Sequence, residues 1–187
     1  MIDVNVIETA KVWPVLHERL VNETDARKRG MIGEIVRHMV GEYCGDTPLI
    51  MDTLIAEPVF HYWGHARQKG PVGYDETFRN YQASEQANRN LVIERVLVDG
   101  DLVFTDGVLQ IALTYDRAAD MCGAEAAKGL DPAKHYLAEI RLGIVWPFAE
   151  NGKIIGEDIY FATTAQVAGP CDPEKRLFPG PVVNKAA

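Results

Sequence analysis

The sequence predicts an α+β fold in which helices come first and an antiparallel sheet follows. Apolar residues recur at helical spacing in the first third of the chain, and much of residues 91–167 has strand composition. Two turn sequences, Asp99-Gly100-Asp101 and Glu150-Asn151-Gly152, lie between the strand-like runs. Such turns are typical of hairpins. We therefore expect helices packed against an antiparallel meander.

Three helices are expected near the N-terminus. The apolar spacing predicts a short helix over residues 13–21 and a second helix that follows Gly33 and ends near Gly45. A third helix is expected from Asp46 through Leu54. Asp is a favoured N-cap, and the proline that follows is tolerated in a first turn.

The next segment is expected to change from helix to strand and back. Glu57-Pro58 interrupts the helical pattern, and residues 59–63 have the composition of a strand. The glycines and the proline of residues 64–73 predict a loop. A further short helix is expected from Tyr74 to about Ala87.

Four strands make up the expected meander. Their ranges are 91–98 and 102–115 in the first hairpin, and 135–148 and 154–167 in the second. Residues 116–134 break the strand pattern, so we expect an inserted loop or short helix there. The tail from Gly169 is rich in proline and is expected to be irregular.

The composition excludes several classes of partner. The chain has 27 acidic against 19 basic residues, a formal net charge of −8, which disfavours nucleic acid and anionic membranes. No apolar run approaches the ~20 residues that span a bilayer, and residues 1–20 do not resemble a signal peptide. Three separated cysteines cannot all pair and suit a reducing compartment. We expect a single cytoplasmic domain with no nucleic-acid or membrane partner.

The order and spacing of several motifs resemble the NTF2-like superfamily. The motifs are Gly45-Asp46 with residues 54–60, the hairpin at residues 98–103, and residues 148–154 followed by Tyr160-Phe161. The superfamily includes SnoaL-like polyketide cyclases, ketosteroid isomerases, limonene-epoxide hydrolases and scytalone dehydratases. The resemblance implies a cone in which a curved antiparallel sheet wraps over the N-terminal helices and encloses a pocket. It also implies a homodimer.

The resemblance covers only part of the chain. We expect one NTF2-like (SnoaL-like) domain over residues 1–187, with a core at about residues 31–167. An N-terminal helical extension (1–30) and an irregular C-terminal tail (169–187) lie outside that core.

The chain departs from the family at each set of catalytic residues that can be placed on it. Ketosteroid isomerases use a general base, an oxyanion-hole tyrosine and a protonated Asp. Limonene-epoxide hydrolases use an Arg, an Asp and a third acid, and scytalone dehydratases use a His–Asp dyad. The corresponding residues are Tyr62, His38 and Ile144 for the isomerase, Gly107, Leu109 and Ile159 for the hydrolase, and Asn90 for the dehydratase histidine. None of these mechanisms can run unchanged.

Strand alternation indicates which residues share a face with those positions. The apolar residues expected to contact a substrate are Trp146, Ile144, Leu109, Ile159 and Phe161. Glu157, His38 and Tyr62 are the polar residues expected in this lining and are the candidate catalytic residues.

Each candidate catalytic residue has a chemical role and an ordinary alternative. Burial would raise the pKa of Glu157, which suits a general acid or base. His38 could transfer a proton, and Tyr62 could donate to a developing oxyanion. Alternatively, Glu157 is a solvated strand-end carboxylate, His38 covers the outer face of its helix, and Tyr62 is a core aromatic.

Two further patterns involve histidine and charged side chains. His61 and His65 have the spacing of a metal-binding pair on a helix, but the sequence between them is typical of a strand and loop, so no metal site is expected. Glu94-Arg95 and Glu139-x-Arg141 are expected to form cross-strand charge pairs on the outer face of the sheet. Alternatively, Arg95 points inward, because it shares the parity of the apolar residues Leu91, Ile93 and Leu97.

The favoured function is a SnoaL-like acid/base enzyme without a cofactor. An isomerase, cyclase, dehydratase or hydrolase would act on an apolar oxygenated small molecule, such as a polyketide, terpenoid or steroid. A non-catalytic small-molecule-binding protein and a dimerising scaffold with a filled cavity are the alternatives. Residues 116–134 could be a lid or a plug of the cavity, and the tail, with Leu177, Phe178, Val182 and Val183, could pack across a neighbouring subunit.

Overall fold

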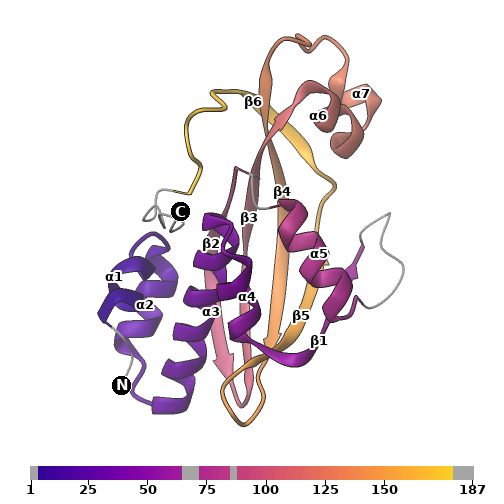
Figure 1. Ribbon diagram of the computed structural model, residues 1–187. Helices are drawn as coiled ribbons and strands as arrows, with labels where there is room; N and C mark the ends of the chain where they lie inside the picture. Colours follow the sequence, from indigo (N-terminus) through magenta and orange to yellow (C-terminus); the bar gives the residue numbers. More distant parts are fainter. Residues whose placement is uncertain (1–3, 65–71, 85–87, 179–187) are drawn as a thin grey trace, which may run out of the picture.

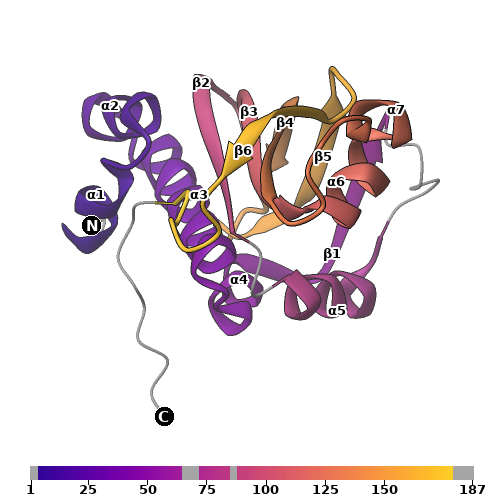
Figure 2. The same cartoon turned by 90° about the horizontal axis from the view of Figure 1, so that it is seen from above.

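The computed structural model describes residues 4–64, 72–84 and 88–178 of the chain, and shows helices packed on a curved sheet (Figures 1 and 2). The helices are α1 (Val4–Ala10), α2 (Pro14–Asn22), α3 (Ala26–Cys44), α4 (Thr47–Thr53), α5 (Tyr74–Ser84), α6 (Tyr115–Cys122) and α7 (Ala124–Ala127). The strands are β1 (Leu54–Trp63), β2 (Arg89–Asp99), β3 (Leu102–Thr114), β4 (His135–Pro147), β5 (Ile154–Phe161) and β6 (Gln166–Cys171).

Local capping sets the ends of the two central helices. The Asp25 carboxylate accepts hydrogen bonds from the backbone N–H groups of Arg27 and Lys28, so α3 begins well before the expected start after Gly33. It ends, as predicted, at Gly45, which has a left-handed φ of 67°. Asp46 caps α4 by accepting from the Leu49 N–H, also as predicted.

The sheet has the order β1-β5-β4-β3-β2, with β6 paired to β4. Both predicted hairpins are present, because β2–β3 and β4–β5 pair antiparallel. The sheet is nevertheless mixed, since β1 runs parallel to β5. Figure 2 looks along the strands and shows the sheet curving from β2 round to β1, with α3 on the open side of the curve.

The last expected strand is divided into two. β5 ends at Phe161, and β6 then pairs with residues 135–139 of β4, a stretch that β5 does not reach. Between them, the Thr163 hydroxyl accepts from the Arg141 N–H at 3.1 Å. The tail from Gly169 therefore starts as part of a strand, which differs from the expected irregular segment.

A bulge between β2 and β3 turns Arg95 to the outer face, as expected for a cross-strand charge pair and contrary to the inward alternative. The register shifts between Ile93 and Arg95, opposite Gly107, where a Cβ would lie 2.0 Å from the Val92 carbonyl oxygen. A bulge reverses the alternation of side chains along a strand. The Arg95 side chain is therefore 67% exposed and pairs with Asp106 on the outer face.

The segments outside the expected core pack on this same chain. Residues 115–127 form α6 and α7, which cover a small separate core around Ala118 and Tyr136. Phe178 is buried and stacks on Trp13 with ring centroids 5.2 Å apart. Phe178 thus packs within its own chain, contrary to the expectation for the tail, and Val182 and Val183 lie outside the described residues. None of the described helices combines the length and apolar character needed to cross a bilayer.

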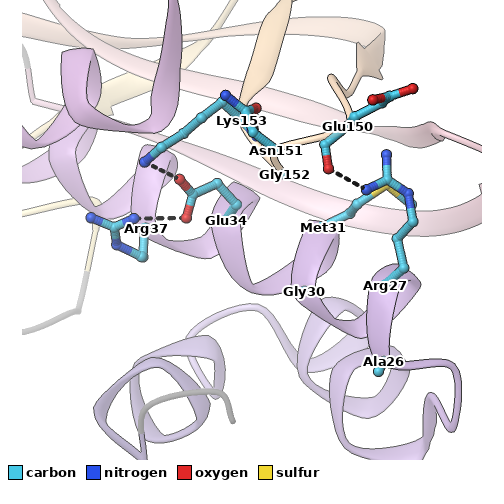
Figure 3. Close-up of a pocket in the computed structure, with 10 residues that line it drawn as sticks. All are labelled: Ala26, Arg27, Gly30, Met31, Glu34, Arg37, Glu150, Asn151, Gly152 and Lys153. Carbon is cyan, nitrogen blue, oxygen red and sulfur yellow. Dashed lines mark hydrogen bonds and ion pairs between the residues drawn. The ribbon is translucent and has the colours of Figure 1, made fainter.

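Charged groups tie α3 to the turn between β4 and β5 (Figure 3). The Lys153 ammonium lies 3.1 Å from the Glu34 carboxylate, and the Arg37 guanidinium contacts the same carboxylate at 2.7 Å. Arg27 donates to the backbone carbonyl of Glu150 at 3.1 Å. These side chains line a shallow hollow but are paired with one another or with backbone, which indicates a structural role.

We predict that Gly156→Ala lowers the free energy of unfolding by about 3 kcal/mol. A Cβ at Gly156 would lie 1.7 Å from the Val59 carbonyl oxygen, so β1 and β5 would have to separate. Gly30→Ala is the matched control, because nothing lies within 4 Å of a Cβ there and alanine favours a helix by about 1 kcal/mol. Urea unfolding of both variants checks this, and equal stabilities would contradict it.

Candidate active site

A cavity of about 480 Å³ lies between the inner face of the sheet and helices α3, α5 and α6. This volume is typical of small-molecule sites. The aliphatic and aromatic lining residues are Tyr43, Tyr62, Leu91, Leu109, Leu142, Ile144, Ile159 and Phe161, of which the two tyrosines carry a hydroxyl, and the remaining polar ones are Glu42, Thr77, Arg89, Arg117 and Glu157.

Most of the substrate-contacting residues expected from the sequence meet in this cavity. Leu109 on β3, Ile144 on β4, and Ile159 and Phe161 on β5 all line it. Trp146 lies deeper and is outside the lining: its indole N–H donates to the Thr105 hydroxyl at 2.9 Å. Its ring stands edge-on to the His38 ring, with centroids 5.6 Å apart, so it supports the site from beneath.

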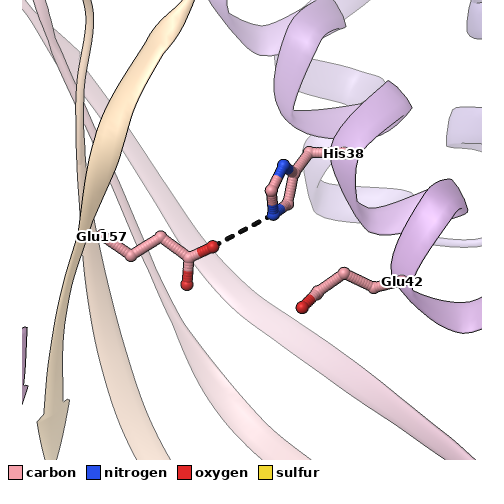
Figure 4. Close-up of side chains that lie close together, drawn as sticks. All are labelled: His38, Glu42 and Glu157. Carbon is pink, nitrogen blue, oxygen red and sulfur yellow. Dashed lines mark ion pairs between the residues drawn. The ribbon is translucent and has the colours of Figure 1, made fainter. Parts of the chain in front are cut away.

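His38 and Glu157 form a buried pair that joins α3 to β5 (Figure 4). The His38 Nε2 and Glu157 Oε1 atoms lie 3.1 Å apart. His38 is 0% and Glu157 4% exposed, so neither the solvated carboxylate nor the outward-facing histidine is present. Glu157 lines the cavity, whereas His38 lies behind it.

The partners of Thr53 define the proton arrangement of His38. The Thr53 hydroxyl donates to the Ile50 carbonyl at 2.5 Å and lies 2.6 Å from His38 Nδ1. Because a hydroxyl has one hydrogen to donate, Nδ1–H must be the donor in the second contact. Nε2 then faces Glu157, and a hydrogen bond between them requires one proton. Whether this proton lies on the nitrogen or the oxygen, the pair is neutral overall.

Glu42 lies close to His38 and Glu157, and the three side chains together could bind a metal ion. The sequence alone did not identify Glu42 as a member of this site. One ligand atom each from His38, Glu42 and Glu157 lies within 4.8 Å of the others, and Figure 4 shows the three side chains directed toward a common space. Nitrogen and carboxylate ligands of this kind can hold a divalent cation. Residues four apart share a helix face, so the spacing of His38 and Glu42 was a usable signal.

His61, one of the two histidines with the spacing of a metal-binding pair, does not contribute to this site. His61 lies on β1 and contacts Asp158 on β5 at 2.7 Å, and both side chains are about one-third exposed. His65 lies outside the described residues.

Tyr62 lines the cavity from β1 and keeps its phenolic proton. Burial, followed by the negative charge of Glu157, raises the pKa of Tyr62 well above the usual tyrosine value. The hydroxyl is therefore a hydrogen-bond donor throughout the physiological pH range.

The comparisons with known proteins identify the fold. No protein-family model and no curated protein matches the sequence. The solved structures include SalBIII, an epoxide hydrolase/cyclase-like enzyme of pyran ring formation in the polyether salinomycin. It has a TM-score of 0.55 and 13% identity over 73% of this chain and 95% of that chain.

Two further solved structures have a similar fold. A SnoaL-like polyketide cyclase from Jannaschia sp. CCS1 has a TM-score of 0.54 and 15% identity over 75% of this chain and 91% of its own. An NTF2-like protein of unknown function from Mesorhizobium loti has a TM-score of 0.51 and 13% identity over 75% of this chain and 98% of its own. The chain therefore has the α+β NTF2-like fold that its motifs resemble. At this identity the likeness concerns the fold.

We predict that Thr53→Val destabilises the protein by about 2 kcal/mol, because the buried His38 Nδ1–H loses its acceptor. Thr53→Ser retains the hydroxyl and should lose less than half as much. Urea unfolding measures both changes. If the valine variant were as stable as the serine variant, the proposed hydrogen-bond direction would be wrong.

A second prediction concerns alkaline stability. Because folding raises the pKa of Tyr62, the folded state holds the phenolic proton more tightly than the unfolded state does. This stabilisation is present below the unfolded pKa of about 10 and is lost as the pH rises above it. The wild type should therefore lose more unfolding free energy than Tyr62→Phe between about pH 8 and pH 11. Parallel losses in urea titrations would contradict this.

Proposed function

We propose that the chain is a cofactor-free acid/base enzyme, of the isomerase, cyclase, dehydratase or hydrolase type, acting on an apolar oxygenated small molecule. The observation that carries this proposal is the buried His38–Glu157 pair, one member of which reaches a cavity with largely apolar walls. Such a pair can receive or release a proton without the participation of bulk water.

Glu157 is the proposed catalytic acid and base because its side chain lines the cavity. With the shared proton on His38 Nε2, the Glu157 carboxylate accepts a proton from a substrate C–H or from a water molecule. The resulting carboxylic acid then returns the proton to another substrate atom. In an isomerisation this transfer balances without any further reactant.

His38 is a positioning residue in this scheme, because Glu157 lies between it and the ligand. Its Nδ1–H is fixed by Thr53, so Nε2 remains directed at the carboxylate during proton transfer. Tyr62 would donate its O–H to an oxygen that becomes negative in the transition state. An apolar substrate body would pack against residues such as Leu109, Ile144 and Ile159.

The comparisons support this class of function in general terms only. SalBIII is described as epoxide hydrolase/cyclase-like and the Jannaschia protein as a polyketide cyclase, so the same fold carries such chemistry elsewhere. The expected homodimer and the expected polyketide, terpenoid or steroid substrates are parts of this proposal.

We predict that Glu157→Gln reduces turnover at least about 100-fold while ligand binding is retained. Turnover can be followed without a known product, as deuterium incorporation from D₂O into apolar cyclic ketones and diketones, measured by mass spectrometry. Binding of the same compounds is measured by calorimetry. Unchanged exchange in the glutamine variant would refute the role of Glu157.

Asp158→Asn is the matched control, because the neighbouring carboxylate lies on the outer face and pairs with His61. It should leave exchange unchanged. Exchange should also survive EDTA. Loss of exchange with EDTA and its recovery with a divalent cation would instead indicate a metal enzyme built on His38, Glu42 and Glu157. Ligand binding without exchange in the wild type would indicate a non-catalytic binding protein.

A further inference from the structure

The charges that line the cavity do not cancel. Arg89 lies on β2 with its guanidinium 3.7 Å from the Glu42 carboxylate, so these opposite charges compensate each other. Glu157 and His38 share one proton and are neutral as a pair. Among the charged residues of the described chain that line the cavity, this leaves Arg117.

Arg117 lies on α6, the helix that directly follows β3. Within the described part of the chain, no acid lies within ion-pair distance of its guanidinium, and no side-chain hydrogen bond satisfies it. The side chain is exposed, yet it lines the cavity. Arg117 therefore occupies the solvent-facing end of the cavity. This end lies near the start of β2, where Arg89 pairs with Ile111 of β3.

Thr77 provides an independent indication of a polar ligand group. It lies on α5, lines the same cavity and is only 3% exposed. Its hydroxyl has no hydrogen-bond partner among the described residues. A buried hydroxyl without a partner is costly, and a bound ligand oxygen would satisfy it.

We propose that the cavity binds an apolar monoanion, most simply a carboxylic acid, whose anionic group contacts Arg117 at the solvent-facing end and accepts from the buried Thr77 hydroxyl. The apolar body then extends along the inner face of the sheet toward Glu157. This inference rests on the proposed function for the identity of the cavity as the ligand site, and it narrows the substrate class from any apolar oxygenated molecule to an acid. Charge-assisted hydrogen bonds from arginine to a carboxylate supply the selectivity.

The test compares octanoate with 1-octanol, which differ in the charge of the head group, by isothermal titration calorimetry. The wild type should bind octanoate about tenfold more tightly than 1-octanol. Arg117→Ala should weaken octanoate binding about tenfold and leave 1-octanol binding unchanged. Arg117→Lys should bind octanoate with an affinity between those of the wild type and Arg117→Ala. Thr77→Val should weaken octanoate several-fold.

Lys128→Ala is the matched control: it removes the same charge at an exposed residue that directly follows α7 and lies outside the cavity lining. It should bind both compounds as the wild type does. The proposal is overturned if Lys128→Ala weakens octanoate binding as much as Arg117→Ala does. It is also overturned if the wild type binds the two compounds equally, or does not bind octanoate.

The same titration in Glu157→Gln separates this inference from the proposed function. If that variant keeps exchange activity but octanoate binding still depends on Arg117, the acid/base role fails and the anion site stands. If exchange is lost while Arg117→Ala binds octanoate normally, the anion site fails and the acid/base role stands.

Discussion

The rest of the structure depends on the buried contact between His38 and Glu157. It crosses the core between α3 and β5, and each member alone would be a polar or charged group without solvent. The surrounding elements keep the two side chains together: Thr53 fixes the histidine ring, and Trp146 packs edge-on against it. The close approach of β1 to Gly156 places the neighbouring Glu157 on the inner face.

This contact also explains how polarity is distributed in the cavity. The deep end is neutral overall, because one proton is shared there, and the walls between the two ends are largely apolar. The cationic Arg117 lies toward solvent, where the cost of an uncompensated charge is small. A ligand would therefore be oriented by its head group and would present its other end to the proton-sharing pair.

Local sequence signals predicted the parts of the fold that depend on neighbouring residues. The hairpin turns, the Asp46 cap and the end of α3 at Gly45 follow from short-range chemistry. Strict alternation along β5 also placed Glu157, Ile159 and Phe161 on one face, because no bulge interrupts that stretch. Alternation alone would turn Arg95 inward, and this alternative fails because a bulge that depends on the partner strand reverses the alternation on β2.

The remaining errors have long-range causes. The parallel pairing of β1 with β5 and the return of Phe178 onto Trp13 join segments far apart in the chain, which no local pattern encodes. Arg89, Arg117 and Thr77 come from three separate elements and meet only in the folded cavity.

The most direct test of the account is the protonation state of His38, measured from the ¹⁵N chemical shifts of protein that contains ¹⁵N-labelled histidine. The His38 signal is assigned by its loss in His38→Gln. The account predicts a protonated Nδ1 and a proton shared between Nε2 and Glu157. An unprotonated Nδ1 that accepts from Thr53, with an Nε2 signal indifferent to Glu157→Gln, would contradict it.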